Sequence, residues 1–191
     1  MQRITDIVDA VVAGSIGETK DAVRQALDRG IAPMQVINEG LVAGLDVVGE
    51  RFATGEMFLP EMMLAALAAR DGIQIAMAGM KAGEYKRKAI IVLGTVKGDL
   101  HDVGKNLVAL VLESRGFEVI DLGVDVHEED FINSVRERKP EFLGMSALIT
   151  TTMKEMGNVI AALTQHGLRN KVKVIVGGAP VTQALSLIHI S

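Results

Sequence analysis

The sequence predicts a two-part fold, with a bundle of four helices over residues 1–85 and a parallel α/β domain over residues 86–191. Apolar residues in the first part repeat at helical spacing, and no strand-like run interrupts them. From residue 89 onward, short β-branched runs alternate with helical segments, which is typical of a parallel sheet. The polar stretch GEYKRK at residues 83–88 separates the two patterns and is the predicted linker.

Each helix expected in the first part has a recognisable pattern or boundary. The first helix carries apolar residues three and four positions apart, namely Ile4, Ile7, Val8, Val11 and Val12. The second covers residues 18–27 and ends at Gly30. The third begins near Pro33, and the fourth begins at Pro60 and runs to about Met80. Short connections between them favour a small antiparallel bundle.

Four strands and three helices are expected to alternate in the second part. The strands are residues 89–93, 117–122, 142–146 and 172–176, and the helices are residues 102–114, 128–138 and 152–163. Ligands of such sheets bind at the carboxyl ends of the strands. Polar or glycine-rich stretches follow three of the strands, at residues 94–106, 146–152 and 177–182. We therefore expect the binding site to be built from these stretches.

The composition excludes several classes of function. The chain has 191 residues, a net charge of -4, four histidines and no cysteine, which rules out thiolate metal sites and cysteine nucleophiles. Lysine and arginine do not cluster, so no nucleic-acid partner is expected. No apolar run reaches the roughly 18 residues of a membrane span, and Asp6 and Asp9 interrupt any signal-peptide core. These features are typical of a cytoplasmic protein with no membrane partner.

The stretch GTVKGDLHDVGKN at residues 94–106 is the most informative part of the sequence. It is not a P-loop, because Asp99 and Asn106 stand where that motif requires glycine and a hydroxyl residue. The dinucleotide fingerprint G-x-G-x-x-G is also absent. A nucleotide triphosphatase and an NAD-dependent enzyme are therefore both disfavoured.

His101 is the candidate metal ligand of this stretch, and an ordinary loop histidine that caps the next helix is the alternative. Asp99 favours ligation, because a carboxylate on the second imidazole nitrogen fixes the tautomer and raises ligand basicity. No nearby cluster completes a zinc site, and His127 and His166 stand alone. A single histidine fits a metal that brings its own equatorial ligands, in haem or a corrin. Covalent haem is excluded, because the Cys-x-x-Cys-His motif is absent.

Three motifs resemble those of the cobalamin-binding fold. DLHDVG at residues 99–104 resembles D-x-H-x-x-G, SALIT at residues 146–150 resembles S-x-L-[IT]-T, and Gly177 and Gly178 resemble the paired glycines. GEMFLPEMM at residues 55–63 is similar to the helical cap of the methyl-carrying members. Over nearly its whole length, the chain resembles the stand-alone corrinoid proteins of methylamine and methanol methyltransferase systems. It is also similar to the B12-binding module of cobalamin-dependent methionine synthase.

The resemblance implies a Rossmann-like, flavodoxin-like domain that holds cobalamin or a related corrinoid base-off, with His101 as the lower axial ligand of cobalt. Asp99 and Thr152 are the implied relay behind His101. The other implied cofactor contacts are Gly98, Asp102, Val103, Gly104, Ser146, Leu148, Thr150, Gly177 and Gly178. Met62 and Met63 are the implied cap over the corrin, and packing in the bundle core is the alternative for most methionines.

The resemblance also implies a methyl carrier of one-carbon metabolism and methanogenesis that is not catalytic alone. A substrate-specific methyltransferase would load it from a methylamine or methanol. An acceptor methyltransferase would pass the methyl group to a thiol or tetrahydropterin, and a reductive activase is the third expected partner. A B12-binding regulator and a mutase-type subunit are the alternatives. Family members continue with a further strand and helix, so the chain is expected to be truncated after about Gln183.

Overall fold

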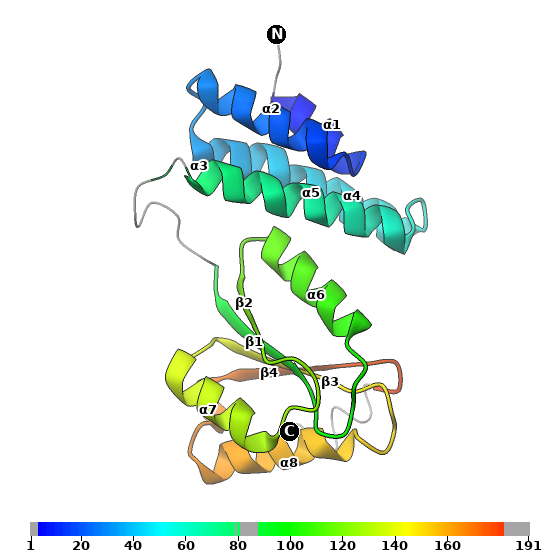
Figure 1. The fold of residues 1–191 in the computed structure, drawn as a ribbon, viewed down its shortest axis with the longest axis vertical. Coiled ribbons are helices and arrows are strands. Elements are labelled where there is room, and N and C mark those ends of the chain that lie inside the picture. The colour runs from blue at the N-terminus through cyan, green and yellow to red at the C-terminus, as the bar shows by residue number, and fades with distance from the viewer. Residues whose placement is uncertain (1–3, 79, 81–87, 182–191) are drawn as a thin grey trace. The chain divides into compact units, whose positions relative to one another are not determined.

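A computed structural model describes residues 4–78, 80 and 88–181 of the chain (Figure 1). The chain divides into two compact units, Met1–Lys86 with Leu110–Gly116, and Arg87–Ala109 with Phe117–Ser191. The predicted sequence of a helical bundle followed by a parallel α/β fold is confirmed. Most of the predicted linker and the tail from residue 182, where the truncation is expected, lie outside the described residues.

The first unit is built from helices that pack around one apolar core. They are α1 (Ile4–Val12), α2 (Ile16–Asp28), α3 (Pro33–Gln35), η1 (Val36–Val42), α4 (Ala43–Thr54) and α5 (Leu59–Ala78). Helices α1, α2, η1, α4 and α5 supply this core, in which Ile7, Val11 and Leu41 are fully buried. Because α3, η1 and α4 follow one another without a break, they correspond to the single third helix that the sequence predicts.

The third predicted helix is not α-helical throughout, because its segment η1 is a π-helix. Its glycine packs tightly against α1, where a Cβ at Gly40 would lie 3.0 Å from Ile7 Cγ2. The next glycine, Gly44 of α4, would place a Cβ 2.8 Å from Val11 Cβ. The apolar residues Ile37, Leu41 and Leu45 keep ordinary helical spacing and give no sign of the wider turn, so periodicity could not reveal it.

An ion pair between α2 and α5 makes the first unit sensitive to acid. Lys20 Nζ lies 2.7 Å from Asp71 Oδ2. This hydrogen bond lowers the pKa of Asp71 below its usual range, although burial acts in the opposite direction. The ionised carboxylate therefore stabilises the folded unit above the unfolded pKa of about 3.9. This contribution is lost as the pH falls through the lower folded pKa.

We expect wild-type protein to lose more stability than Asp71→Asn when the pH falls from about 7 to about 3. The difference should be below about 1 kcal/mol, because both side chains are partly exposed. Urea unfolding followed by circular dichroism at the two pH values measures it. Equal losses of stability in the two proteins would contradict a stabilising role for the Lys20–Asp71 ion pair.

The second unit is a four-stranded parallel sheet with helices between the strands. Its elements are β1 (Ile90–Thr95), the first half of α6 (Val103–Ser114), β2 (Glu118–Asp121), α7 (Glu128–Arg138), β3 (Phe142–Ser146), α8 (Lys154–Gln165), η2 (Arg169–Lys171) and β4 (Lys173–Gly177). The strand order is β2-β1-β3-β4, and every neighbouring pair is parallel. Central strand β1 is almost wholly buried, as its unbroken apolar run predicts.

Helices α7 and α8 pack together over one face of this sheet (Figure 1). Phe131 of α7, Leu143 of β3 and Leu163 of α8 are fully buried in the core between them. This core holds the strands rigidly, so the loops at their carboxyl ends start from fixed positions. Within the described part of the chain, we find no helix with the length and apolar character needed to cross a bilayer.

Candidate functional site

The last residues of three strands form one row across the sheet. Thr95 of β1 is in register with Ser146 of β3, and Ser146 is in register with Gly177 of β4. The three stretches that the sequence predicts as binding loops therefore leave the sheet side by side. This alignment brings residues that are about 50 positions apart in the sequence into contact, as between Asp99 and Leu148.

A tight turn after β1 directs Asp99 inward. The Asp99 N–H donates to the carbonyl oxygen of Val96 at 3.1 Å, which closes a turn over residues 96–99. Gly98 is the third residue of this turn and has a φ of +78°. Type II turns need a positive φ at this position, so glycine suits it. The Asp99 side chain that follows is fully buried.

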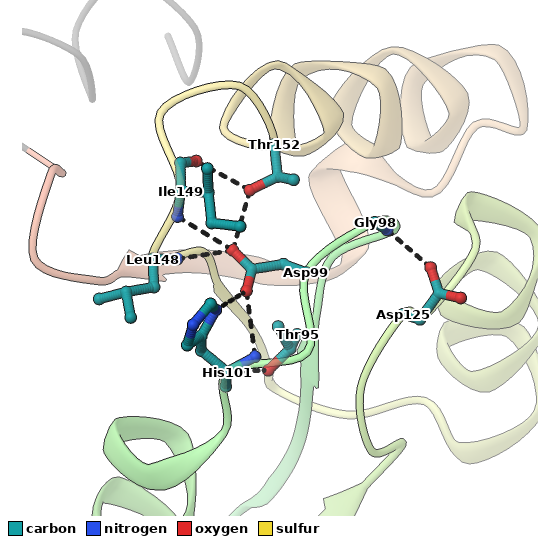
Figure 2. A network of polar contacts seen from close by, with 8 residues as sticks. All are labelled: Thr95, Gly98, Asp99, His101, Asp125, Leu148, Ile149 and Thr152. Carbon is teal, nitrogen blue, oxygen red and sulfur yellow. Dashed lines mark hydrogen bonds and ion pairs between the residues drawn. The ribbon is translucent and has the colours of Figure 1, made fainter.

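The Asp99 carboxylate accepts hydrogen bonds from both the β1 and the β3 loops (Figure 2). Its Oδ1 lies 2.8 Å from His101 Nδ1 and 3.1 Å from the His101 backbone nitrogen. Its Oδ2 lies 2.7 Å from the backbone nitrogen of Leu148, 3.1 Å from that of Ile149 and 2.9 Å from Thr152 Oγ1. Both oxygens are thus used, and the carboxylate has one orientation.

These donors keep Asp99 ionised although it is buried. Burial alone would raise the pKa of Asp99, but the hydrogen bonds from the His101 side chain and from three backbone N–H groups outweigh it. The pKa of Asp99 therefore lies well below its usual range. A buried carboxylate with this set of donors is a permanent hydrogen-bond acceptor at neutral pH.

His101 is held by one ring nitrogen and presents the other. Because ionised Asp99 can only accept, the proton of a neutral His101 ring sits on Nδ1, and Nε2 keeps its lone pair. No described group hydrogen-bonds to Nε2, and 54% of the side chain is exposed. Thr95 Oγ1 also donates to the His101 carbonyl oxygen at 3.1 Å, which holds the backbone. The arrangement suits the binding of a metal that approaches Nε2 from solvent.

Exposed apolar side chains lie next to His101 in sequence and next to Asp99 in space. Leu100 and Val103 are 70% and 81% exposed, and Leu148, whose N–H binds Asp99, is 45% exposed. Exposed apolar groups gathered at one site indicate a ligand with an apolar surface. The described residues contain no group of three or more His, Asp or Glu side chains that could hold a metal ion by themselves. The site therefore suits a metal that arrives inside an apolar ring.

Thr152 connects Asp99 with the β3 loop. Its hydroxyl oxygen lies 2.9 Å from Asp99 Oδ2 and 2.8 Å from the carbonyl oxygen of Ile149. A hydroxyl has a single proton, so it donates to one of these oxygens at a time. The charged carboxylate is the stronger acceptor. Thr152 therefore donates to Asp99 while the carboxylate is ionised.

An apolar cavity of about 360 Å³ lies beside this network in the same unit. It is lined by Leu93, Gly104, Lys105, Val108, Gly144, Met145, Ser146, Ile175, Val176, Gly177 and Gly178. A Cβ added at Gly104 or Gly177 would meet no atom within 4 Å, so these two glycines leave space. Gly178 differs, because its φ is +136° and its Cβ would lie 1.8 Å from the Ala147 carbonyl oxygen. Its backbone position excludes any side chain.

The remaining predicted site residues are more scattered. Asp102 accepts a hydrogen bond from Asn106 Nδ2 at 2.9 Å at the start of α6. Thr150 is exposed in the β3 loop and is not among the residues that line the cavity. Met62 and Met63 lie in α5 of the first unit, where Met62 packs against a small buried cluster and Met63 is 37% exposed.

Two polar residues of the site escaped the sequence analysis. Asp125, in the loop after β2, accepts a hydrogen bond from Gly98 N at 2.6 Å (Figure 2). Lys105 of α6 has a side chain only 2% exposed, and it forms an ion pair with Asp121 at the end of β2. The available signal was the sequence DLGVDV at residues 121–126, since this loop also follows a strand's carboxyl end.

Family models match both units of the chain. Two models, each described as a B12 binding domain, match residues 3–76 and 89–189. Among curated relatives, the chain is 44% identical over 179 residues to dimethylamine corrinoid protein 3 of Methanosarcina acetivorans, covering 94% of this chain and 84% of the relative. It is 39% identical over 184 residues to the trimethylamine corrinoid protein of Methanosarcina barkeri, covering 95% and 82%.

Solved structures agree with these matches. The chain is 32% identical to a chain in the methanol:cobalamin methyltransferase complex of Methanosarcina barkeri, with a TM-score of 0.87 over 97% of this chain and 71% of that one. It is 33% identical to a cobalamin-binding protein of Desulfitobacterium hafniense, with a TM-score of 0.81 over 98% and 89%.

Proposed function

The chain belongs to the corrinoid proteins of methylamine and methanol methyltransferase systems, and on this premise we propose that it binds a corrinoid and carries methyl groups between two methyltransferases. The observation that carries the proposal is the exposed His101 ring, whose Nδ1 is bound to a fully buried carboxylate. The bound corrinoid supplies a cobalt that can accept and release a methyl group. The protein supplies the ligand, its orientation and the surroundings.

We assign His101 Nε2 as the lower ligand of cobalt in a base-off corrinoid. Asp99 fixes the tautomer and orientation of the ring, and its negative charge makes the imidazole a stronger donor. Leu148, Val103 and Leu100 would pack against the apolar underside of the ring system. Thr152 completes the relay and stabilises the charge on Asp99. Among the described residues no three His, Asp or Glu side chains gather to hold a metal ion by themselves, which supports a macrocycle.

The apolar cavity beside Ser146 is the proposed slot for the displaced nucleotide tail of the cofactor. Gly104 and Gly177 line it where any side chain would point into open space. Gly98 and Asp102 would shape the loops around the ligand, and Gly178 lines the slot with a backbone position that excludes any side chain. Thr150 is proposed to contact the cofactor from the loop rim.

The methionines of α5 are the proposed cap over the other face of the corrin. Met63 is the better candidate, because it is 37% exposed on a part of α5 where Leu59 and Leu64 are also exposed, at 41% and 47%. Met62 supports it from the cluster around Val48 and Met57. An apolar cover would keep water away from the reactive metal.

Narrowing the slot should weaken binding without unfolding the protein. In Gly177→Ala the new methyl group meets no protein atom, so the free energy of unfolding should change by less than about 0.5 kcal/mol. Cobalamin affinity should fall about tenfold, because the tail would be overpacked. Titration of the cobalamin-free protein measures the affinity. Gly17→Ala, also into open space but in α2, is the control and should bind normally. Equal affinities in all three proteins would place the tail elsewhere.

Methyl transfer between proteins tests the function itself. The cobalamin-loaded, reduced chain would be mixed with isotope-labelled dimethylamine and a dimethylamine methyltransferase, since relatives named for dimethylamine are 42–46% identical to it. The expected result is label on the protein-bound cofactor, which a thiol or tetrahydropterin methyltransferase then removes. Parallel reactions with trimethylamine, monomethylamine and methanol identify the donor. The absence of label with every donor and partner would reject the carrier function.

A further inference from the structure

The loop between β2 and α7 runs along the loop that carries Asp99 and His101. Thr95 N donates to the Gly123 carbonyl oxygen at 3.0 Å, and Val126 N donates to the Thr95 carbonyl oxygen at 2.9 Å. Val96 and Val126 form an isolated parallel bridge, and both are buried. The first part of the β1 loop is therefore held to the β2–α7 loop by backbone hydrogen bonds.

Asp125 forms one hydrogen bond on each side of the Gly98–Asp99 peptide unit, in the next part of the β1 loop. Its Oδ1 accepts from the Gly98 N–H at 2.6 Å (Figure 2). Its own N–H donates to the Asp99 carbonyl oxygen at 3.0 Å. Gly98 is the flexible residue of the 96–99 turn, with a φ of +78°. Its N–H points out of the turn, so a side-chain acceptor is needed to hold it.

The backbone of Asp125 itself is unusual. Only Asp125 and Lys139 are non-glycine residues with positive φ among the residues that the structure describes. Lys139 is the residue that ends α7, a common place for this conformation. Asp125, with a φ of +52°, ends no helix. Aspartate is one of the few side chains that tolerate this conformation, and its short carboxylate can then reach a neighbouring backbone.

We propose that Asp125 is a positioning residue for the metal ligand, because it clamps the Gly98–Asp99 peptide and thereby aims the Asp99 carboxylate at His101. Rotation at Gly98 would turn the Asp99 side chain away from His101 Nδ1 and from the β3 loop together. The clamp is formed by an acceptor oxygen and a left-handed backbone, rather than by the negative charge alone. The expected effect of Asp125 on cobalamin binding rests on the proposed corrinoid function, whereas its effect on the Gly98–Asp99 peptide does not.

Three substitutions separate the acceptor, the charge and the backbone of Asp125. Asp125→Asn retains an acceptor oxygen and tolerates positive φ. Asp125→Gly keeps the backbone conformation without the acceptor, and Asp125→Ala removes the acceptor and strains the backbone. Asp130→Ala, an exposed acidic residue of α7 that lines the same cleft as Asp125, is the control for charge. Thermal unfolding of each full-length variant checks that it is folded.

Amide hydrogen exchange at Gly98 in the cobalamin-free protein is the first readout. We expect faster exchange in Asp125→Gly and Asp125→Ala, and protection near that of wild type in Asp125→Asn and Asp130→Ala. The second readout is cobalamin affinity, together with the spectrum that reports histidine ligation. The same two variants should bind about three- to tenfold more weakly, as expected for one lost hydrogen bond, with a smaller histidine-ligated fraction.

The two readouts distinguish failure of the clamp from failure of the proposed function. Unchanged Gly98 exchange in Asp125→Gly would overturn the clamp, whatever the cofactor does. Faster exchange with wild-type affinity and spectrum would overturn its role in positioning His101. If Asp125→Asn lost as much Gly98 protection or cobalamin affinity as Asp125→Gly, an acceptor oxygen would not be sufficient. That result would also overturn the proposed clamp. If wild-type protein bound no cobalamin, the proposed function would fail, and Gly98 exchange alone would decide the clamp.

Discussion

Replacing His101 with alanine is expected to weaken cobalamin binding by more than about 100-fold, since loss of residues that only support a metal ligand already costs 10- to 100-fold. The fold should be preserved, because more than half of the His101 side chain is exposed and Asp99 keeps its backbone and Thr152 donors. Equilibrium titration of the cobalamin-free variant measures the affinity. Its absorption spectrum shows whether a histidine-ligated form remains.

His166→Ala is the matched control for this substitution. His166 is exposed at the end of α8 in the same unit, and no described side-chain contact joins it to the site. The control should bind cobalamin with wild-type affinity and spectrum. Wild-type affinity and spectrum in His101→Ala would remove His101 from the metal and leave the account without a ligand.

The second large effect is expected from Asp99→Asn, which preserves shape but changes what the side chain can accept. One oxygen of the amide can face His101, but the amide nitrogen then faces the N–H groups of Leu148 and Ile149. The opposite orientation places the amide nitrogen against His101 instead. Either way, buried donors lose their acceptor, and the free energy of unfolding should fall by about 2–4 kcal/mol.

This effect is measurable without any cofactor. Urea unfolding of the cobalamin-free protein, followed by circular dichroism, compares Asp99→Asn with Asp102→Asn. Asp102 accepts one described side-chain hydrogen bond, from Asn106, and an amide oxygen can still accept it, so its variant should change by less than about 0.5 kcal/mol. Similar stabilities for the two variants would show that the buried network does not hold the loops together.

The sequence predicts the order of elements well, because each has a local signal. Strand β3 begins and ends at the predicted residues 142–146, β4 agrees within one residue at each end, and β1 agrees within two. Strands β1 and β3 are short and largely buried, as parallel strands are, whereas the edge strands β2 and β4 are more exposed. The π-helical segment η1 was missed because its buried positions keep ordinary helical spacing.

The site is less completely encoded in local patterns. The DLHDVG motif locates Asp99 and His101, which are two residues apart, and their side chains are hydrogen-bonded in the structure. The backbone N–H groups of Leu148 and Ile149 carry no sequence signature, because any residue other than proline could supply them. Asp125 reaches Gly98 across 27 positions, and only the sheet order places their loops together. Such contacts depend on topology, which a single sequence does not specify.

The most direct test of the central claim is electron paramagnetic resonance of the cobalt(II) form of cobalamin bound to the wild-type chain. The protein would be prepared once with ordinary histidine and once with histidine labelled with the heavy nitrogen isotope. We predict that labelling changes the nitrogen splitting of the cobalt signal, because the lower ligand is the His101 imidazole, and that His101→Ala shows no such change. A splitting pattern that is the same with both histidines would contradict the account.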